Sequence, residues 1–182
     1  MIRNLLAASV VAVLGSVAFG ADLKSGPQAG DKVPGPFHPL NINGESAGKK
    51  ACLYCKAGDS PTVAIFARNL EAANLTKLIA AVEEATAKNA KAELNSFVVF
   101  CSGDEKLEAK LKDAADKAKL KNVVLSIESA EGPEKYNISK DAEITVIVYK
   151  ERVVSANMSF EKGKMTEKDV EKVLAEIAKV VK

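Results

Sequence analysis

Two short apolar runs decide the fold of this chain: Thr62-Val-Ala-Ile-Phe-Ala67 and Ser96-Phe-Val-Val-Phe-Cys101. Both are rich in β-branched and aromatic residues without polar alternation, which is typical of strands that are buried on both faces of a sheet. Between the runs, four apolar residues recur at helical spacing: Leu75, Leu78, Ile79 and Val82. We therefore expect a helix from about residue 70 to residue 89, with Asn69 as its N-cap.

The same alternation continues on both sides of these runs. Downstream, Asp104 is expected to cap an amphipathic helix that extends to about Ala118, and residues 123–127 form another apolar run. Upstream, a short strand is expected within residues 37–42. Strands and helices thus alternate along the chain, which indicates parallel strands joined by right-handed crossovers.

The C-terminal part changes from crossovers to a hairpin. Residues 144–149 and 153–160 are two further strand-like runs, separated only by Lys150-Glu151-Arg152. Because the connection is so short, these two strands are expected to be antiparallel. Thr166 and Asp169 have the spacing of a capping box at the start of a last amphipathic helix. The predicted fold class is α/β, a three-layer sandwich in which a mixed central sheet has helices on both faces.

The N-terminal residues have the pattern of an export signal. Arg3 precedes an apolar run from Leu5 to Phe19, and small residues follow up to Gly20. The run is shorter than the roughly 20 residues that a membrane-spanning helix needs. We therefore expect a signal peptide over residues 1–20, cleaved after Gly20, and a mature protein in the periplasm or outside the cell, without membrane attachment.

The amino-acid composition argues against some classes of function. The 182-residue chain has a formal net charge of +2, with 47% hydrophobic and 27% charged residues. This balance is ordinary for a globular domain, and the small charge argues against nucleic acid as a partner. The single His excludes a multi-histidine metal site within one chain. A Pro- and Gly-rich lead-in is expected over residues 21–50, followed by one domain over residues 51–182.

In its order of elements, the chain resembles the thioredoxin-like superfamily, and within it the redoxin branch of peroxiredoxins and exported thioredoxin-like proteins. Three stretches carry the resemblance: Gly30 to Pro34, Phe97 to Glu105, and Glu134-Lys-Tyr-Asn-Ile138 before the hairpin. The resemblance covers residues 31–182. It implies a thioredoxin-like sandwich and thiol–disulfide chemistry.

The sequence departs from that family at the place where the resemblance implies an active site. Redoxins carry redox cysteines directly after the first central strand, where this chain has Arg68-Asn69-Leu70-Glu71. The Cys52-Leu-Tyr-Cys55 pair instead precedes that strand, in a stretch whose composition is typical of a loop. The cis-proline that the family places before its fourth strand corresponds to Ile144 here. The resemblance therefore extends to the fold, with a displaced Cys-x-x-Cys.

Cys52 and Cys55 are the main candidates for chemistry. Their spacing lets the second thiol resolve a mixed disulfide formed by the first, and nearby lysines favour the thiolate form. We expect thiol–disulfide redox chemistry without an organic cofactor. By analogy with the family, Cys52 is the more exposed, attacking thiol and Cys55 the resolving one. The expected partners are protein thiols or disulfides of exported proteins.

Two alternatives for this pair stay open. In one, the disulfide is a structural staple and the protein is a non-catalytic binding module with a thioredoxin-like fold. In the other, the two thiolates hold copper or zinc, with His38 as a third ligand.

Three further residues are candidates for a role near the pair. Arg68 follows the first central strand, where it either holds a thiolate or anion or forms an ion pair with Glu71. Cys101 ends a buried strand, as a small core residue or as a third, resolving thiol. Tyr54 lies inside the pair, where it either contacts a partner as an exposed aromatic residue or covers the loop.

Overall fold

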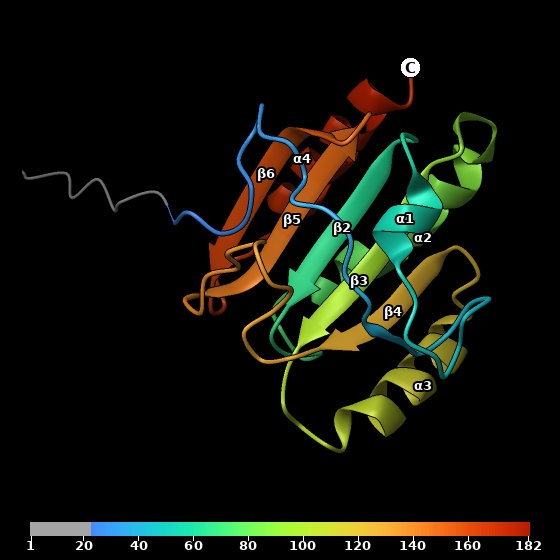
Figure 1. The fold of residues 1–182 in the computed structure, drawn as a ribbon, viewed down its shortest axis with the longest axis vertical. Coiled ribbons are helices and arrows are strands. Elements are labelled where there is room, and N and C mark those ends of the chain that lie inside the picture. Colours follow the sequence, from blue (N-terminus) through green and yellow to red (C-terminus); the bar gives the residue numbers. More distant parts are fainter. Residues whose placement is uncertain (1–22) are drawn as a thin grey trace, which may run out of the picture.

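The computed structural model describes residues 23–182 (Figure 1). The predicted signal peptide and its cleavage after Gly20 therefore lie outside the described residues. Six strands, four α-helices and one 3₁₀ turn follow one another in the described part of the chain: β1 (Leu40–Asn41), α1 (Leu53–Ala57), β2 (Thr62–Ala67), α2 (Leu75–Lys88), η1 (Ala90–Ala92), β3 (Asn95–Cys101), α3 (Leu107–Ala118), β4 (Val123–Glu128), β5 (Ala142–Lys150), β6 (Val153–Glu161) and α4 (Glu167–Val180). No described helix has both the length and the apolar character that crossing a membrane requires.

The sheet is mixed, as predicted, and has the strand order β1-β4-β3-β2-β5-β6. Strands β2, β3 and β4 are parallel to one another, whereas β5 is antiparallel to β2 and β6 is antiparallel to β5. Strand β1 adds two residues antiparallel to β4, within the expected range of residues 37–42. Its shortness suits an edge strand, which natural proteins keep short to avoid pairing with other chains.

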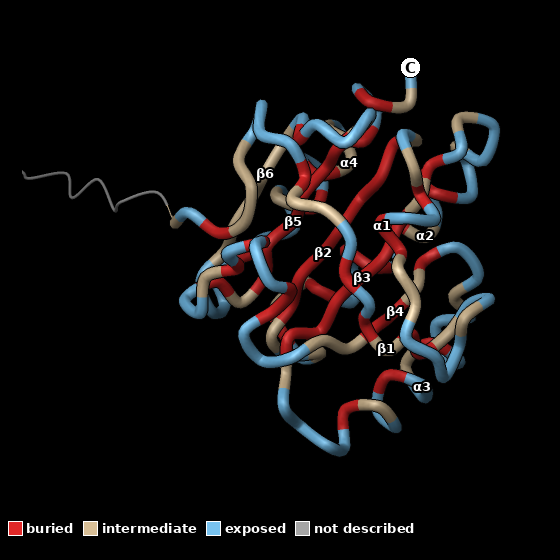
Figure 2. Tube along the Cα trace, viewed as in Figure 1, coloured by how far each residue is buried: buried red, intermediate tan, exposed pale blue. Residues whose placement is uncertain are grey.

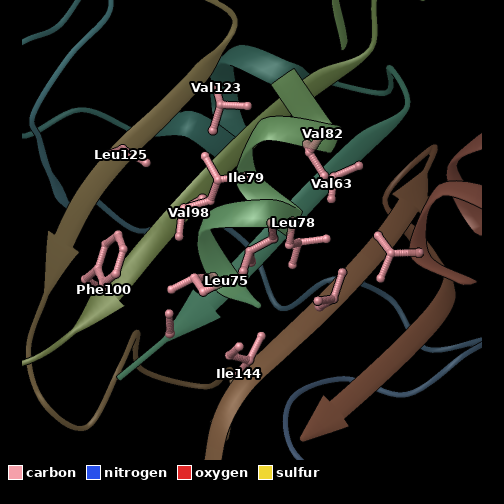
Figure 3. Close-up of a cluster of buried hydrophobic side chains, with 14 of the residues drawn as sticks. Val63, Leu75, Leu78, Ile79, Val82, Val98, Phe100, Val123, Leu125 and Ile144 are labelled. Atoms are coloured by element: carbon pink, nitrogen blue, oxygen red, sulfur yellow. The ribbon is translucent and has the colours of Figure 1, made fainter. Parts of the chain in front are cut away.

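One face of the sheet carries the larger core. Apolar side chains of α2, α3 and α4 pack there against alternate residues of the strands, among them Val98 and Ile144. Figure 3 shows the α2 side chains pointing onto the strands, and Figure 2 shows the central strands buried along most of their length. The steps from β2 to β3 and from β3 to β4 run in the same direction, so two right-handed crossovers put α2 and α3 on the same face.

The opposite face also carries a helix, as predicted, but only the short α1. A second core there contains Phe66, Phe97 and Tyr136, and its cover comes from Phe37, other lead-in residues and the short helix α1. The lead-in is held to the sheet edge because the Gly30 N–H donates to the Val154 carbonyl at 2.8 Å. This layer thus consists of extended chain and five helical residues, since all three long helices occupy the other face.

Two helices begin later than the sequence predicts. Asn69 does not cap α2, because its Oδ1 accepts the Glu71 N–H in a separate turn, and Asn74 precedes the helix in a left-handed conformation (φ 59°). Asp104 likewise accepts the Lys106 N–H one turn before α3 begins. The capping box of Thr166 and Asp169 at the start of α4 is confirmed.

The loop before β4 is held by one carboxylate, Glu83 on α2. Its oxygens accept the backbone N–H groups of Lys121, Asn122 and Val123, and the Asn122 side-chain amide, at 2.7–3.1 Å. Burial opposes ionisation of Glu83, but these donors outweigh it, so the pKa of this carboxyl lies below its ordinary value of 4.5. The loop therefore has a fixed position relative to α2.

We expect Glu83→Gln to lower the free energy of unfolding by about 1–2 kcal/mol at pH 7, because charge-assisted hydrogen bonds are lost. A carboxyl whose pKa is lowered in the folded state stabilises the fold above its unfolded pKa, and this contribution disappears as the pH falls through the folded pKa. Urea unfolding at pH 7 and pH 3 is the measurement. The difference between wild type and variant should shrink at pH 3, and an unchanged difference would contradict the assignment.

Candidate functional site

The Cys52–Cys55 pair lies at the start of a helix and not in a loop. Cys52 is the N-cap of α1, and its Sγ accepts the Cys55 N–H at 3.0 Å. The two residues form a disulfide with a Cα–Cα distance of 5.2 Å. The loop prediction was wrong because Leu53, Tyr54 and Ala57 recur at helical spacing and bury one side of α1, a short pattern that its polar, Gly- and Pro-containing surroundings obscure.

Packing against the sheet fixes the position of α1. The Tyr54 ring lies 6.5 Å from the ring of Tyr149, and the Arg152 guanidinium lies over it at 5.5 Å from the centroid. Tyr54 is only 8% exposed, so it is a core residue of this layer and is not available to a partner as an exposed aromatic side chain. Arg152 is held in turn by Asp59 at 3.0 Å.

The two cysteines differ in exposure, in the order opposite to the one expected. Cys55 is exposed, whereas Cys52 is half-buried and packs against the second core. The N–H of Cys55 points at Cys52, which favours negative charge on the Cys52 sulfur. Cys55 is therefore the more exposed residue of the pair, and Cys52 is the one whose sulfur accepts a backbone N–H.

Three lysines lie close to the pair in the sequence. Lys49, Lys50 and Lys56 are all exposed, and Lys56 pairs with Glu45 at 2.6 Å. This hydrogen bond and the charge of Lys56 hold the pKa of Glu45 below its ordinary value. Since both partners are well exposed, the ion pair is weak and can exchange with another carboxylate.

The pair lies at the amino end of β2. Tyr149, which packs against α1, is opposite Thr62, the first residue of that strand. Figure 1 shows α1 beside the beginning of β2 and β3, away from their arrowheads. Arg68 follows the last residue of β2, and a six-residue strand separates the two ends by roughly 17 Å. The predicted candidates Cys52, Cys55 and Arg68 therefore do not form one site.

Arg68 holds the loop between β4 and β5. Its guanidinium donates to the carbonyl oxygens of Ala130, Ile138 and Ser139, the last at 3.0 Å. Within residues 23–182 it makes no ion pair, so the expected pairing with Glu71 is absent from this part of the chain. Its hydrogen bonds give it a structural role at the carboxyl end of the sheet.

Cys101 is a core residue at the same carboxyl end. It is 3% exposed, and burial raises the pKa of its thiol to about 12 despite the positive charge of Arg68. A thiol with this pKa has almost no thiolate at neutral pH and is inert in exchange. Cys101 is the last residue of β3, whereas α1 lies beside the start of that strand (Figure 1).

Neither His38 nor another residue completes a metal centre with the pair. Across residues 23–182, no three His, Cys, Asp or Glu side chains gather closely enough to hold a metal ion. His38 is exposed, and the two sulfurs are joined to each other. Ile144, which takes the place of the family's proline, is buried in the larger core opposite Ala67.

Comparison with solved structures identifies the fold. The peroxidoxin BcpB from Mycobacterium tuberculosis superimposes with a TM-score of 0.59, at 17% identity, over 84% of this chain and 97% of its own. A candidate protein disulfide isomerase from Bacteroides thetaiotaomicron gives a TM-score of 0.63 at 15% identity over 87% and 94% of the two chains. This chain has the thioredoxin-like fold of the redoxins. A candidate thiol:disulfide interchange protein, DsbE, from Chlorobium tepidum matches this redoxin fold too, with a TM-score of 0.61 at 14% identity over 88% and 100% of the chains.

Comparison by sequence alone finds no match for this chain. No protein family matches the chain, and no curated protein matches it. The structural similarity therefore establishes the architecture, and the chemistry has to be argued from this chain's own disulfide. That disulfide lies at the amino end of the central strands, whereas Arg68 and its hydrogen-bonded loop occupy the carboxyl end.

Proposed function

We propose that this protein is exported and carries out thiol–disulfide exchange with protein thiols through Cys52 and Cys55. The observation that carries the proposal is the exposed disulfide at the start of α1, with the Cys52 sulfur accepting a backbone N–H at 3.0 Å. The fold adds support, since the similar solved structures include proteins named for thiol–disulfide interchange.

The exchange begins at the accessible sulfur, Cys55. A substrate thiolate attacks Cys55 Sγ, forms a new S–S bond with it and breaks the Cys52–Cys55 bond, so that Cys52 leaves as a thiolate. The N–H of Cys55 stabilises that leaving group. A second substrate thiolate then attacks the mixed disulfide and releases Cys55. In total, two substrate thiols are oxidised to a disulfide while the protein disulfide is reduced to two thiols, and the reverse sequence reduces a substrate.

Export rests on the sequence of residues 1–20. Arg3, the apolar run and the small residues before Ala21 support a signal peptide that is cleaved after Gly20. An oxidising compartment keeps an exposed disulfide of this kind intact. Expression of the full chain in a Gram-negative bacterium, followed by intact mass spectrometry of the periplasmic fraction, tests the cleavage. A protein that stays full-length in the cytoplasm contradicts this part of the proposal.

The reduction potential of the Cys52–Cys55 pair tests the chemistry. We expect a value of roughly −120 to −270 mV, the range of catalytic oxidoreductases, because one sulfur is exposed and the dithiol form has a stabilised thiolate. Alkylation and mass spectrometry of the mature protein across a series of glutathione buffers give the potential. A value below about −300 mV would instead identify a structural disulfide, and the alternative of a non-catalytic binding module would then replace this proposal.

A further inference from the structure

A polar hollow lies directly beside the redox pair, at the amino ends of β3 and β4. It has a volume of about 230 Å³, and α1 forms one wall of it through Leu53 and Lys56, the residues that follow Cys52 and Cys55 in the chain. Residues at the start of β3 and in the loop before β4 form the other walls: Leu94, Asn95, Ser96, Phe97, Lys121, Asn122 and Val124. A second hollow of about 370 Å³ shares Lys56, Asn95 and Asn122 and extends the first toward Ser60 and Glu93. The Glu93 carboxylate accepts the Ser60 hydroxyl at 3.2 Å, so the acidic group of this second hollow already has a partner.

The two charged residues that line the hollow nearest the pair are both basic. They are Lys56 and Lys121, and no acidic residue lines this hollow. Among the described residues Lys121 makes no ion pair, and the one partner of Lys56 is the exposed Glu45. A carboxylate in the hollow would therefore be close to one lysine that has no ion pair and to a second lysine whose exposed, weak ion pair can exchange.

Lys121 is carried on a loop with a fixed position. The three successive N–H groups of Lys121, Asn122 and Val123 all donate to Glu83, which also fixes the Asn122 side chain. The wall is therefore formed before a ligand arrives, which lowers the entropic cost of binding. Thr86 and Ser96 also line the hollow, and their hydroxyl groups form a hydrogen bond of 2.6 Å with each other. These two hydroxyl groups therefore need no hydrogen-bond partner from a ligand.

We propose that this hollow selects substrate cysteines whose neighbouring residues are acidic. Lys56 and Lys121 bind a Glu or Asp side chain of the substrate segment, and its cysteine reaches Cys55 across the exposed side of α1. The hollow has room for one or two side chains and not for a folded domain. This proposal rests on the proposed exchange function, for which it names the substrate class.

The test compares two synthetic peptides, each with one cysteine, flanked by glutamates in one peptide and by glutamines in the other. The rate at which each peptide reduces the oxidised mature protein is measured by acid quench and alkylation. We expect the glutamate peptide to react about two- to fivefold faster for each ion pair that it forms, the effect that a partly exposed pair produces. In Lys121→Gln that preference for the glutamate peptide should fall by the same factor. Higher ionic strength should reduce the preference in the wild type.

Lys162→Gln is the matched control. It removes the same charge from an exposed turn after β6, at the other end of the sheet, and should leave the preference for the glutamate peptide intact. Equal rates for the two peptides with the wild type, or an unchanged preference in Lys121→Gln, would refute the selection of acidic segments.

Binding is measured separately so that failure of the exchange chemistry does not obscure the result. Peptides in which serine replaces the cysteine are titrated while the backbone amide NMR signals are followed. The glutamate peptide should shift the signals of Lys121, Asn122 and Lys56, and the glutamine peptide should not. If these shifts occur but neither cysteine peptide reduces the disulfide, the exchange function is wrong and the acidic binding site remains. If reduction occurs without the shifts, the exchange function remains and the acidic binding site is wrong.

Discussion

A Cys52→Ser variant should accumulate a mixed disulfide at Cys55, and a Cys55→Ser variant should accumulate far less at Cys52. Each variant, in its reduced form, is incubated with oxidised glutathione, and the adduct is measured by intact mass spectrometry. We expect a difference on the order of tenfold, since an attacking or attacked sulfur needs open access along the S–S axis, and Cys55 is exposed whereas Cys52 is half-buried. In the Cys52→Ser variant, no second thiol is close enough to resolve the adduct.

The remaining cysteine provides the control for this experiment. In the double variant Cys52→Ser/Cys55→Ser, Cys101 should give no adduct, because its thiol is buried and its pKa is about 12. If Cys55→Ser accumulated more adduct than Cys52→Ser, then Cys52 would be the attacking thiol, and the stabilised charge on its sulfur would outweigh its limited access. Adduct formation at neither position in the single variants would exclude exchange through this pair.

Phe66→Ala should cause the largest loss of stability, about 3–5 kcal/mol, as is usual for removing a buried aromatic ring. Phe66 is 1% exposed near the carboxyl end of β2, with its ring 5.6 Å from that of Tyr136 and 6.2 Å from that of Phe37. These contacts join the central strand to the lead-in and to the loop before β5. The loss is a large fraction of the 5–15 kcal/mol that a domain of this size typically has.

Urea unfolding of the oxidised protein measures this effect, with Phe160→Ala as the matched change on the edge strand β6. Phe160 is only half-buried, so its truncation should cost about 1–2 kcal/mol, in line with the smaller apolar area removed from contact. A smaller loss for Phe66→Ala than for Phe160→Ala would mean that the layer on this face of the sheet is not a core. The lead-in would then be a loosely attached segment.

The two ends of the central sheet differ in the groups that they hold. At the carboxyl end, Arg68 binds three carbonyl oxygens and Cys101 is buried, so this end is occupied by structural contacts. At the amino end, the second core supports a short helix that holds the disulfide at the surface. Because both ends belong to the same rigid strands, either one offers a fixed platform for a reactive group.

Local sequence was sufficient for most of the architecture. The apolar runs at residues 62–67 and 96–101 predicted the central strands, because residues buried on both faces of a sheet leave a continuous apolar pattern. The tight turn at Glu151 and Arg152 predicted the hairpin, and Thr166 with Asp169 predicted the start of α4. Each of these features leaves a pattern among residues that are close in sequence, so the sequence alone predicts them.

The chemistry of the pair depended on tertiary contacts. The sequence determined that Cys52 and Cys55 are close enough to form a disulfide, but their relative exposure follows from which side of α1 packs on Tyr149. Lys121 is far from the pair in the chain, and only the pairing of β3 with β4 brings it beside Lys56. The sequence therefore determined the fold and the cysteine pair. The tertiary structure decided which cysteine is exposed and which charged residues lie near the pair. The physical reason is that the packing of a short helix, and contacts between distant parts of the chain, leave no pattern in the local sequence.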